Sequence, residues 1–490
     1  MAGNAQEGVY VERDNGGNNW FHVLACTIVS NGLHGYRYHG YNCQTYITNT
    51  ILAHNGGFAT YFTGWGGSQK PTIDYSCVYG NSSGTYYTAA GLVLPVIGPN
   101  VMSSDPLFAG PLADWSLAAG SPCIGAGLDL SEGWNITNDV NGTLRTNAYD
   151  IGCYESAYAP PARYDAVYVD AGRPDDSGAG TNWATAKKTI GAGLSIVSSS
   201  GTCWLAAGAY SENVSMPSFV TLSGTNRQST IISAANSTVA MSGSNALLRS
   251  VTVTGGTRGV WMSGRANRVR DCIVRNNSES GIYITAQDNA VEDSILANNQ
   301  YGLYAPGWGG QYILDRCVVC SNSSHGVYQY GGNPTSPGGL LRNCLIFRNG
   351  GDGFSSWTDN GPTNTFLYNC TIVSNAGNGV YDNYLTRYPF VINCVIAGNG
   401  QYGIRQANNG HYAFVVRTCN VFGNAMGNFS HFQANGQITL YEGNISADPC
   451  FAGADSWRLA SNSPCIGWGA DLSASGVTDD IEKNPCSGVF

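Results

Sequence analysis

Charged residues are scarce in this chain. Asp, Glu, Lys and Arg make up 11 % of its 490 residues, against about 25 % in an average globular protein. Lysine is the rarest of them, with only four among 23 basic residues, and the formal net charge is −9. Because the arginines are scattered and form no basic stripe, we expect no binding to nucleic acid.

Long apolar runs are missing as well. None reaches the length of about 18 residues that crosses a bilayer, so we expect no membrane span. The opening residues, Met1 to Glu7, hold neither a basic region nor an apolar stretch, so we expect no secretion signal within this sequence. The composition excludes disorder, because hydrophobic residues make up 43 % and include 29 Tyr and 11 Trp.

Glycine is abundant, with 65 residues, and much of it belongs to a phrase that returns through the second half of the chain. The phrase runs from a polar residue and Cys, through two or three apolar residues, to Asn and then to Gly, an apolar residue and Tyr. Cys272, Asn277 and Gly281 mark one copy. Later copies follow at intervals of about 22 to 27 residues, at Ser294, Cys317, Cys344, Cys370, Cys394 and Cys419.

A period of this length, made of short apolar runs broken by Asn and Gly, cannot be helical. Each unit holds two or three strands that are too short to bury a face alone. Successive units must therefore stack, with every strand parallel to its copy about 4.8 Å away. An Asn at a fixed turn position tolerates the left-handed conformation and bonds its copies in neighbouring coils. The predicted fold class is all-β, a right-handed parallel β-helix or solenoid.

These phrases resemble the parallel β-helix repeats of the pectate-lyase-like superfamily, especially those of large bacterial surface proteins. The stretches 168–171, 175–178 and 183–186 resemble the opening segment of such domains, as does 206–214. The resemblance implies the fold. It leaves the function open, because this scaffold carries lyases, hydrolases, epimerases, adhesins and inert fibres.

A second, longer repeat divides the chain. The stretch 105–125, which contains Trp115, recurs from Asp448 with Trp457, and 26–31 recurs as 370–375. We therefore predict two tandem units. Residues 1–157 are the C-terminal part of a first β-helix unit with its closing segment, and residues 165–490 are a second, nearly complete unit. Residues 158–164 form a linker whose two prolines cannot continue a sheet ladder.

The ends of the sequence fall at unusual places in these units. By the alignment of repeats, Met1 lies in the middle of a coil, and Phe490 lies where the closing phrase of the first unit, 150–155, would begin in the second. A flat parallel edge is normally covered. We therefore expect either a segment of a longer tandem array or a fibre completed head-to-tail by copies of the chain.

An outward aromatic column is the main candidate for binding. Side chains alternate along a strand, so the residue after the inward apolar one in each Gly-apolar-Tyr phrase points outward. Such rings could stack on sugars, or they could form a structural ladder that shields the sheet. The candidate glycan-binding residues are Trp261, Tyr283, Tyr304, Tyr328, Trp357 and Tyr381.

Catalysis is the alternative. The resemblance implies that a lyase would need carboxylates holding Ca²⁺ beside an arginine or lysine base, and that a hydrolase would need close carboxylates. The spacing of the acidic residues in the repeats does not bring three of them to one position of successive coils. We therefore predict no catalytic residue, metal or cofactor, and we expect Ca²⁺ only if the chain is a lyase. The candidates under that alternative are Asp352, Asp359, Asp382, Arg387 and Arg405.

The cysteines of the repeat are best interpreted as small apolar filling with free thiols, although the coil spacing also permits disulfides. Near the unit ends, Cys450 with Cys465 and Cys123 with Cys153 are further possible pairs.

Taken together, these features predict a non-catalytic structural or adhesive β-helix, extracellular or at the cell surface, with polysaccharide and copies of itself as candidate partners. The alternative is a polysaccharide lyase or glycoside hydrolase of the same fold, and a phage or virion fibre is a third option.

Overall fold

The computed structural model describes residues 1–13, 19–40, 43–63, 72–88, 95–98, 100–110, 114–145, 149–159, 162–306, 311–330, 338–357, 365–382, 389–406, 414–431, 438–440, 442–453 and 456–484. The chain forms two compact units. Unit 1 comprises Met1–Ala206, Val214–Leu222 and Met241–Ala246, and unit 2 comprises Ala207–Asn213, Ser223–Ala240 and Leu247–Phe490. The linker expected at 158–164 remains a prediction.

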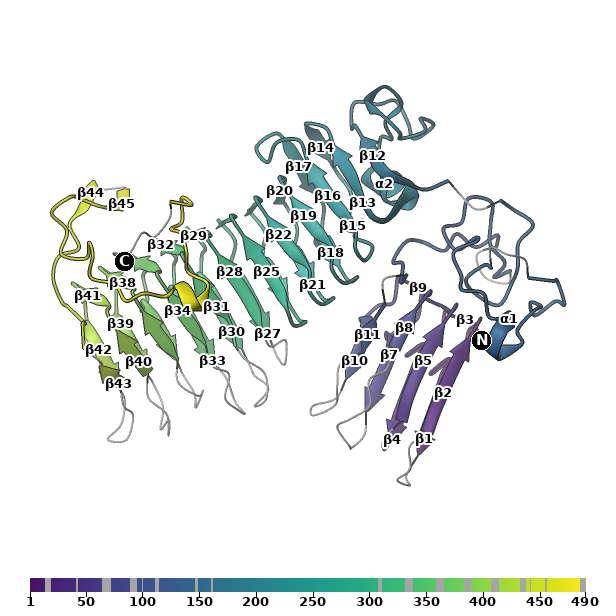
Figure 1. The fold of residues 1–490 in the computed structure, drawn as a ribbon, viewed down its shortest axis with the longest axis horizontal. Coiled ribbons are helices and arrows are strands. Elements are labelled where there is room, and N and C mark those ends of the chain that lie inside the picture. Colours follow the sequence, from purple (N-terminus) through teal and green to yellow (C-terminus); the bar gives the residue numbers. More distant parts are fainter. Residues whose placement is uncertain are drawn as a thin grey trace. The chain divides into compact units, whose positions relative to one another are not determined.

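The first part of unit 1 is a short solenoid of parallel strands (Figure 1). Each coil contributes one strand to each of three sheets. The first sheet has the order β1 (Val9–Arg13), β4 (Tyr36–Gly40), β7 (Phe58–Thr63), β10 (Gly84–Thr88). The second is β2 (Asn19–Leu24), β5 (Cys43–Thr48), β8 (Thr72–Asp74), β11 (Val96–Ile97), and the third is β3 (Thr27–Val29), β6 (Ile51–Ala53), β9 (Cys77–Tyr79).

The rest of unit 1 is a closing segment with little regular structure, followed by the start of the next solenoid. The closing segment contains α1 (Ser131–Trp134). After it come β12 (Tyr164–Val169), η1 (Trp183–Thr185), α2 (Ile190–Ile196), β13 (Val197–Leu205) and β15 (Val214–Ser215). Thr189 caps α2, since its side chain accepts a hydrogen bond from the backbone N–H of Ala192. No helix in the described ranges is both long and apolar enough to cross a membrane.

Unit 2 repeats the three-sheet coil many times, with all neighbouring strands of the three sheets parallel (Figure 1). One sheet, here called the groove sheet, has the order β14 (Gly208–Tyr210), β17 (Thr230–Ser233), β20 (Thr252–Thr254), β23 (Ile273–Arg275), β26 (Ile295–Ala297), β29 (Val318–Cys320), β32 (Leu345–Phe347), β35 (Thr371–Val373), β38 (Val395–Ala397), β41 (Asn420–Phe422).

The second sheet of unit 2, here called the aromatic sheet, carries the candidate binding residues. Its order is β18 (Ser237–Met241), β21 (Arg258–Met262), β24 (Ser280–Ile284), β27 (Tyr301–Pro306), β30 (Val327–Tyr330), β33 (Phe354–Trp357), β36 (Val380–Asp382), β39 (Tyr402–Gln406), β42 (Gly427–His431).

The third sheet completes each coil. In unit 2 it follows the order β19 (Leu247–Arg249), β22 (Arg268–Arg270), β25 (Asn289–Glu292), β28 (Tyr312–Asp315), β31 (Leu340–Arg342), β34 (Phe366–Tyr368), β37 (Phe390–Ile392), β40 (Phe414–Arg417), β43 (Ile438–Leu440), while β16 (Thr221–Gly224) belongs partly to each unit. The coils are followed by an antiparallel hairpin, β44 (Phe451–Gly453) and β45 (Ser456–Leu459), and by η2 (Ser473–Ser475).

The core of the solenoid consists of the expected columns of aliphatic residues. In the groove sheet, Val319, Ile346 and Ile372 face inward in register and are fully buried. Burying one such side chain stabilises the fold by roughly 1.5–3 kcal/mol. Each inward residue packs on its copy in the next coil. The stacked strands therefore bury apolar surface that a single strand of three residues could not bury alone.

A buried asparagine ladder runs beside these columns. The amide Nδ2 of Asn349 donates to Oδ1 of Asn375 at 2.8 Å, and that of Asn375 donates to Oδ1 of Asn399 at 3.0 Å. Each Oδ1 also accepts the backbone N–H of the preceding ladder residue, at 3.1 and 3.0 Å for the same pairs. Unit 1 has the same ladder through Asn4, Asn31, Asn55 and Asn81.

The left-handed conformation expected at the ladder asparagines lies instead one residue earlier. Positive φ angles of 52–56° occur at Asn298, Ser321, Arg348 and Ser374, each directly before a ladder residue. The ladder asparagines themselves are absent from the residues with positive φ in the described ranges. The physical reason is that the chain turns its corner one residue before the buried amide, which must point inward to reach its copies.

The cysteine column is buried and its thiols are free. Cys272, Cys317, Cys344, Cys370, Cys394 and Cys419 are all free, and so are Cys123, Cys153, Cys450 and Cys465, so the proposed pairs near the unit ends are not formed. Burial raises the pKa of Cys272 to about 12. Equivalent positions hold hydroxyls, as where Ser294 Oγ accepts the backbone N–H of Cys272 at 3.1 Å. A small side chain that hydrogen-bonds to the neighbouring coil therefore suits this position.

We expect Asn375→Ala to lower the free energy of unfolding by about 2–4 kcal/mol, because it leaves buried amide groups of the flanking coils without partners. Ser323→Ala is the matched control, since Ser323 is exposed beside the ladder residue Asn322. It should change stability by less than about 0.5 kcal/mol. Urea denaturation followed by circular dichroism measures both, and equal stabilities would contradict the role of the ladder.

Candidate functional site

The aromatic sheet carries an in-register column of side chains on its outer face. Trp261 lies opposite Tyr283, which lies opposite Tyr304, which lies opposite Tyr328. The column continues through Ser355, Tyr381 and Arg405. Its inward neighbours Ile282, Leu303 and Val327 are fully buried. The strict alternation along each strand places the aromatic residues outside.

The rings of this column touch one another. The ring centroids of Tyr304 and Tyr328 are 5.3 Å apart with an angle of 15° between planes, whereas Tyr283 meets Tyr304 at 5.4 Å and 76°. Tyr301, three residues before Tyr304 on β27, stacks on Tyr328 at a centroid distance of 5.3 Å. Half-buried, Tyr304 has its pKa raised to about 12, chiefly by this burial. The column is thus a packed aromatic surface with only its edges and outer faces in contact with solvent.

The most exposed rings lie two residues further along the strands. Tyr330 and Trp357 are opposite each other in neighbouring strands and are 39 % and 42 % exposed. Tyr330 lies 6.3 Å from Tyr328, centroid to centroid. Trp357 is one of the glycan-binding residues predicted from the sequence, whereas Tyr330 is not, and together they form the most exposed aromatic pair of this face. Large exposed apolar side chains that adjoin one another mark binding surfaces more often than isolated ones do.

Two arginines interact with the column. The Arg258 guanidinium lies 3.6 Å from the Tyr283 ring centroid, while its Nε pairs with Glu279 at 3.0 Å. Arg405 lies 5.5 Å from the Tyr381 ring. Such cation–π contacts hold ring orientation and cost the arginine little hydration.

His325 and Asp352 form a polar group at the edge of the same surface. The backbone N–H of Asp352 donates to Nδ1 of His325 at 2.9 Å, so this nitrogen acts as an acceptor. The Asp352 carboxylate accepts from the backbone N–H and side-chain amide of Asn378 at 2.7 and 2.8 Å. Asp352 is therefore buried and engaged in holding two coils together.

Two of the remaining catalytic candidates, Asp382 and Arg405, lie on opposite faces of the aromatic sheet. Asp382 is 1 % exposed and lies on the inner face of β36, since it follows the outward Tyr381. As a catalytic candidate Asp382 would have to face the substrate, whereas the alternation of side chains along β36 turns it inward. Arg405 lies outward on β39. Asp359 and Arg387 lie outside the described residues. Across the described ranges, no group of three His, Cys, Asp or Glu side chains could hold a metal ion.

Unit 1 has an aromatic column of its own that the sequence analysis did not single out. Tyr10, Arg37, Tyr61 and Tyr87 lie in register on β1, β4, β7 and β10. Arg37 lies between the rings of Tyr10 and Tyr61, at 5.0 and 5.6 Å, and pairs with Glu7 at 2.8 Å. The phrase Gly8-Val9-Tyr10 was the available signal, but arginine in the next coil interrupts the pattern.

The histidine is also repeated between the units. His34 Nδ1 accepts the backbone N–H of Phe58 at 2.9 Å, and its ring stacks on Tyr61 at 4.1 Å. Burial lowers the pKa of both His34 and His325, although Glu7 and Asp352 respectively oppose the shift. In both units, then, a neutral imidazole supports the aromatic column.

These lowered pKa values predict a loss of stability in weak acid. The unfolded imidazoles take up protons near their usual pKa of about 6.5, before the folded ones do, so stability present at pH 7 declines below that value. The slope cannot exceed about 1.4 kcal/mol per pH unit for each proton taken up. Urea denaturation at pH 7, 6 and 5 should show a shallower decline for His34→Gln/His325→Gln. His54→Gln serves as the control, and parallel curves for all three proteins would contradict the prediction.

Comparison with known proteins identifies the family. The sequence matches the family described as "Right handed beta helix region" over residues 191–333 and 307–463. No curated protein matches the sequence.

Solved structures with similar folds include a pectate lyase, 15 % identical, covering 64 % of this chain and 93 % of its own, with a TM-score of 0.47. The A-module of a mannuronan C-5 epimerase from Azotobacter vinelandii is 15 % identical over 51 % of this chain and 91 % of its own, with a TM-score of 0.37. A tailspike from Acinetobacter baumannii bacteriophage Fri1, a capsular polysaccharide depolymerase, is 11 % identical over 50 % and 56 %, with a TM-score of 0.40. The in-register parallel coils and the match to more than half of the sequence lead to one conclusion: this chain belongs to the right-handed parallel β-helix family.

Proposed function

We propose that the aromatic sheet binds polysaccharide without cleaving it, and that the chain is a structural or adhesive β-helix outside the cell. The observation that carries the proposal is the exposed pair Tyr330 and Trp357, which continues the packed rings of Tyr304 and Tyr328. Neighbouring strands place these rings about 4.8 Å apart. A row of rings with few charges suits the apolar faces of sugar rings, whose hydroxyls remain in solvent.

The surroundings of the rings favour binding over catalysis. Asp352 is held by hydrogen bonds from Asn378, and Asp382 points into the core. An acid catalyst or a nucleophile has to reach the scissile bond, and a pair of carboxylates has to stand about 5–9.5 Å apart across it. Neither of these two carboxylates is exposed on the aromatic surface.

The same proposal includes an extracellular or cell-surface location. It also includes a tandem arrangement of two β-helix repeats, residues 1–157 and 165–490, joined by a linker at 158–164. Parallel stacking makes a stiff spacer, because a bend would break hydrogen bonds in all three sheets of a coil. The low content of lysine and the few surface charges are compatible with a role among polysaccharides.

Affinity electrophoresis against a panel of neutral and acidic polysaccharides tests the binding. Tyr330→Ala/Trp357→Ala should weaken binding about tenfold, since each lost aromatic contact removes roughly 0.5–1.5 kcal/mol. Tyr158→Ala is the control, because Tyr158 is 52 % exposed in unit 1 and lies outside both columns. Retardation of the double variant that equals that of the wild type for every polymer would refute the proposed surface.

The same incubations should release neither new reducing ends nor unsaturated products. Product from any polymer would replace the proposal with the lyase or hydrolase alternative. Asp352→Asn and Arg405→Ala would then be the first variants to measure for loss of product.

A further inference from the structure

Each unit ends in a closing segment, residues 105–145 in unit 1 and 448–484 in unit 2. The described parts of these two segments have the same local structure. In unit 1, the side chain of Asn49 bonds the backbone of Leu128 twice, at 2.7 and 2.8 Å. In unit 2, Asn393 bonds the backbone of Ala470 in the same two ways, at 2.7 and 2.8 Å. An amide in the solenoid thus fastens the same point of the closing segment in both units.

Further contacts extend the correspondence. The perpendicular pair Phe108 and Trp115, 5.1 Å apart at 87°, is repeated by Phe451 and Trp457, 5.3 Å apart at 88°. Four residues of unit 1 bond to the stretch described next, and each has a counterpart in unit 2. Written with the residue of unit 1 first, the pairs are Thr27 and Thr371, Asn49 and Asn393, Cys123 and Cys465, and Val140 and Ile481.

The last of these counterparts rests on a repeated turn. The carboxylate of Asp139 accepts the backbone N–H groups of Asn141 and Thr143, at 2.8 and 2.7 Å. The carboxylate of Asp480 accepts those of Glu482 and Asn484, both at 2.8 Å. Val140 and Ile481 therefore follow the same aspartate in the same turn.

In unit 1, a short irregular stretch, Asp150 to Glu155, lies between the closing segment and the solenoid. Its backbone N–H groups donate in turn to three acceptors: Ile151 to the carbonyl of Cys123 at 2.9 Å, Gly152 to the carbonyl of Asn49 at 2.8 Å, and Cys153 to the Thr27 hydroxyl at 3.1 Å. The carbonyl of Cys153 accepts from Val140 at 3.0 Å.

The side chains of this stretch also fit their surroundings. Ile151 is fully buried against Ile51 and Cys77. The Asp150 carboxylate accepts the backbone N–H of Gly125 at 2.7 Å. Gly152 has φ of +109°, and a Cβ there would lie 2.9 Å from Ile51 and from Thr27. Only glycine suits this position.

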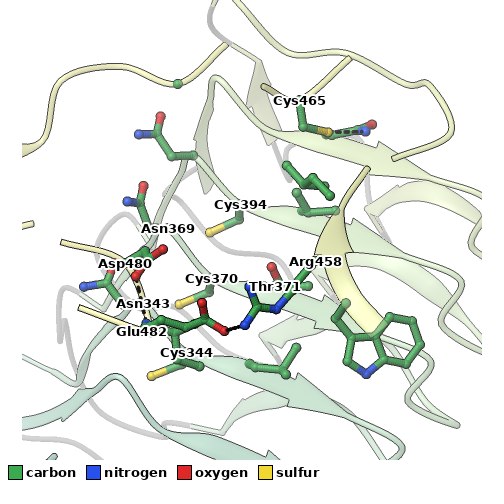
Figure 2. A pocket seen from close by; sticks show the side chains of 18 of the residues that line it. Asn343, Cys344, Asn369, Cys370, Thr371, Cys394, Arg458, Cys465, Asp480 and Glu482 are labelled. Carbon is green, nitrogen blue, oxygen red and sulfur yellow. Dashed lines mark hydrogen bonds and ion pairs between the residues drawn. The ribbon is translucent and has the colours of Figure 1, made fainter. Parts of the chain in front are cut away.

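In unit 2 the corresponding space is a groove of about 880 Å³. Its lining includes the four counterparts Thr371, Asn393, Cys465 and Ile481. Figure 2 shows Thr371 beside Cys370 and Cys394, facing the closing segment that carries Asp480 and Glu482. Ile466 is 55 % exposed, whereas its counterpart Ile124 is 2 % exposed.

An independent observation points to a ligand in the same groove. Asn343 is 3 % exposed and lines the groove, yet within the described part of the chain neither its amide nitrogen nor its amide oxygen has a hydrogen-bond partner. A buried amide without partners costs roughly 1–3 kcal/mol. An extended peptide offers both a carbonyl and an N–H to such a group, as backbone does in a sheet.

We propose that this groove of unit 2 binds a peptide segment of the pattern Asp-Ile-Gly-Cys, in the way that unit 1 binds its own residues 150–155. The peptide N–H groups would be accepted by Cys465, Asn393 and Thr371, and the apolar residue would cover Val395, the counterpart of Ile51. The occupant is a polypeptide, because the groove matches a backbone with three successive donors and requires a left-handed glycine between them.

The test uses the full chain and a labelled peptide with the sequence of residues 149–155, Tyr-Asp-Ile-Gly-Cys-Tyr-Glu. Fluorescence anisotropy should show binding at peptide concentrations below about 1 mM. The peptide with Gly152→Val should bind at least about tenfold more weakly, because valine disfavours the positive φ of this glycine and its Cβ would meet the hydroxyl of Thr371, the counterpart of Thr27. This comparison leaves the protein unchanged, so it does not depend on the folding of a variant.

Two protein variants locate the site. Thr371→Val should weaken peptide binding about fivefold, the effect of one lost hydrogen bond. Thr27→Val should leave binding unchanged, because the corresponding site in unit 1 is filled by its own stretch. Four results would overturn the proposal: no binding at about 1 mM, equal binding of the Gly→Val peptide, weakening by Thr27→Val rather than Thr371→Val, or binding of an oligosaccharide alone that depends on Thr371.

Discussion

The stacking of each coil on its copy is the constraint on which the rest of this structure depends. Strands of three to five residues have no stability of their own, and they persist because an inward residue packs on the same residue one coil away. The asparagine ladder fixes the register of this packing. Each amide donates to the next ladder residue and accepts from the preceding one, so a shift of one residue in any coil would leave several buried groups without partners.

The same constraint separates the inside of the solenoid from its outer faces. Inward positions accept only residues that can stack on their copies, which is why cysteine and serine exchange at the position before the groove-sheet strands from β23 to β41. Outward positions are limited only by their neighbours along the sheet. The aromatic sheet uses this freedom for a row of rings, and unit 1 uses it for a different row in which Arg37 lies between two tyrosines.

Both units combine a solenoid with an irregular closing segment that packs on one of its sheets, β3-β6-β9 in unit 1 and the groove sheet in unit 2. In each, an asparagine of the solenoid and a Phe–Trp pair of the closing segment hold the same geometry. The two units differ in what fills the space between the closing segment and the solenoid. Residues 150–155 satisfy the backbone groups of unit 1, whereas unit 2 presents the equivalent groups to a groove. One scaffold thus provides both a closed and an open version of the same peptide-binding geometry.

The sequence by itself determined the fold class, the period of the coil and the direction of the column residues. These follow from local rules: short apolar runs broken by Asn and Gly must be strands that stack, and alternation along a strand assigns its faces. That is why the register from Trp261 to Arg405 was predictable residue by residue.

Only the tertiary structure decided which polar groups meet. It placed the left-handed corner one residue before the ladder, turned Asp382 into the core, engaged Asp352 with Asn378, and set Tyr330 beside Trp357 as the most exposed pair. The tertiary structure also decided the groove, because its lining comes from coils and a closing segment about 100 residues apart in the chain. Contacts of this kind depend on the path of irregular segments, which no period describes, so they become visible only when the chain is folded.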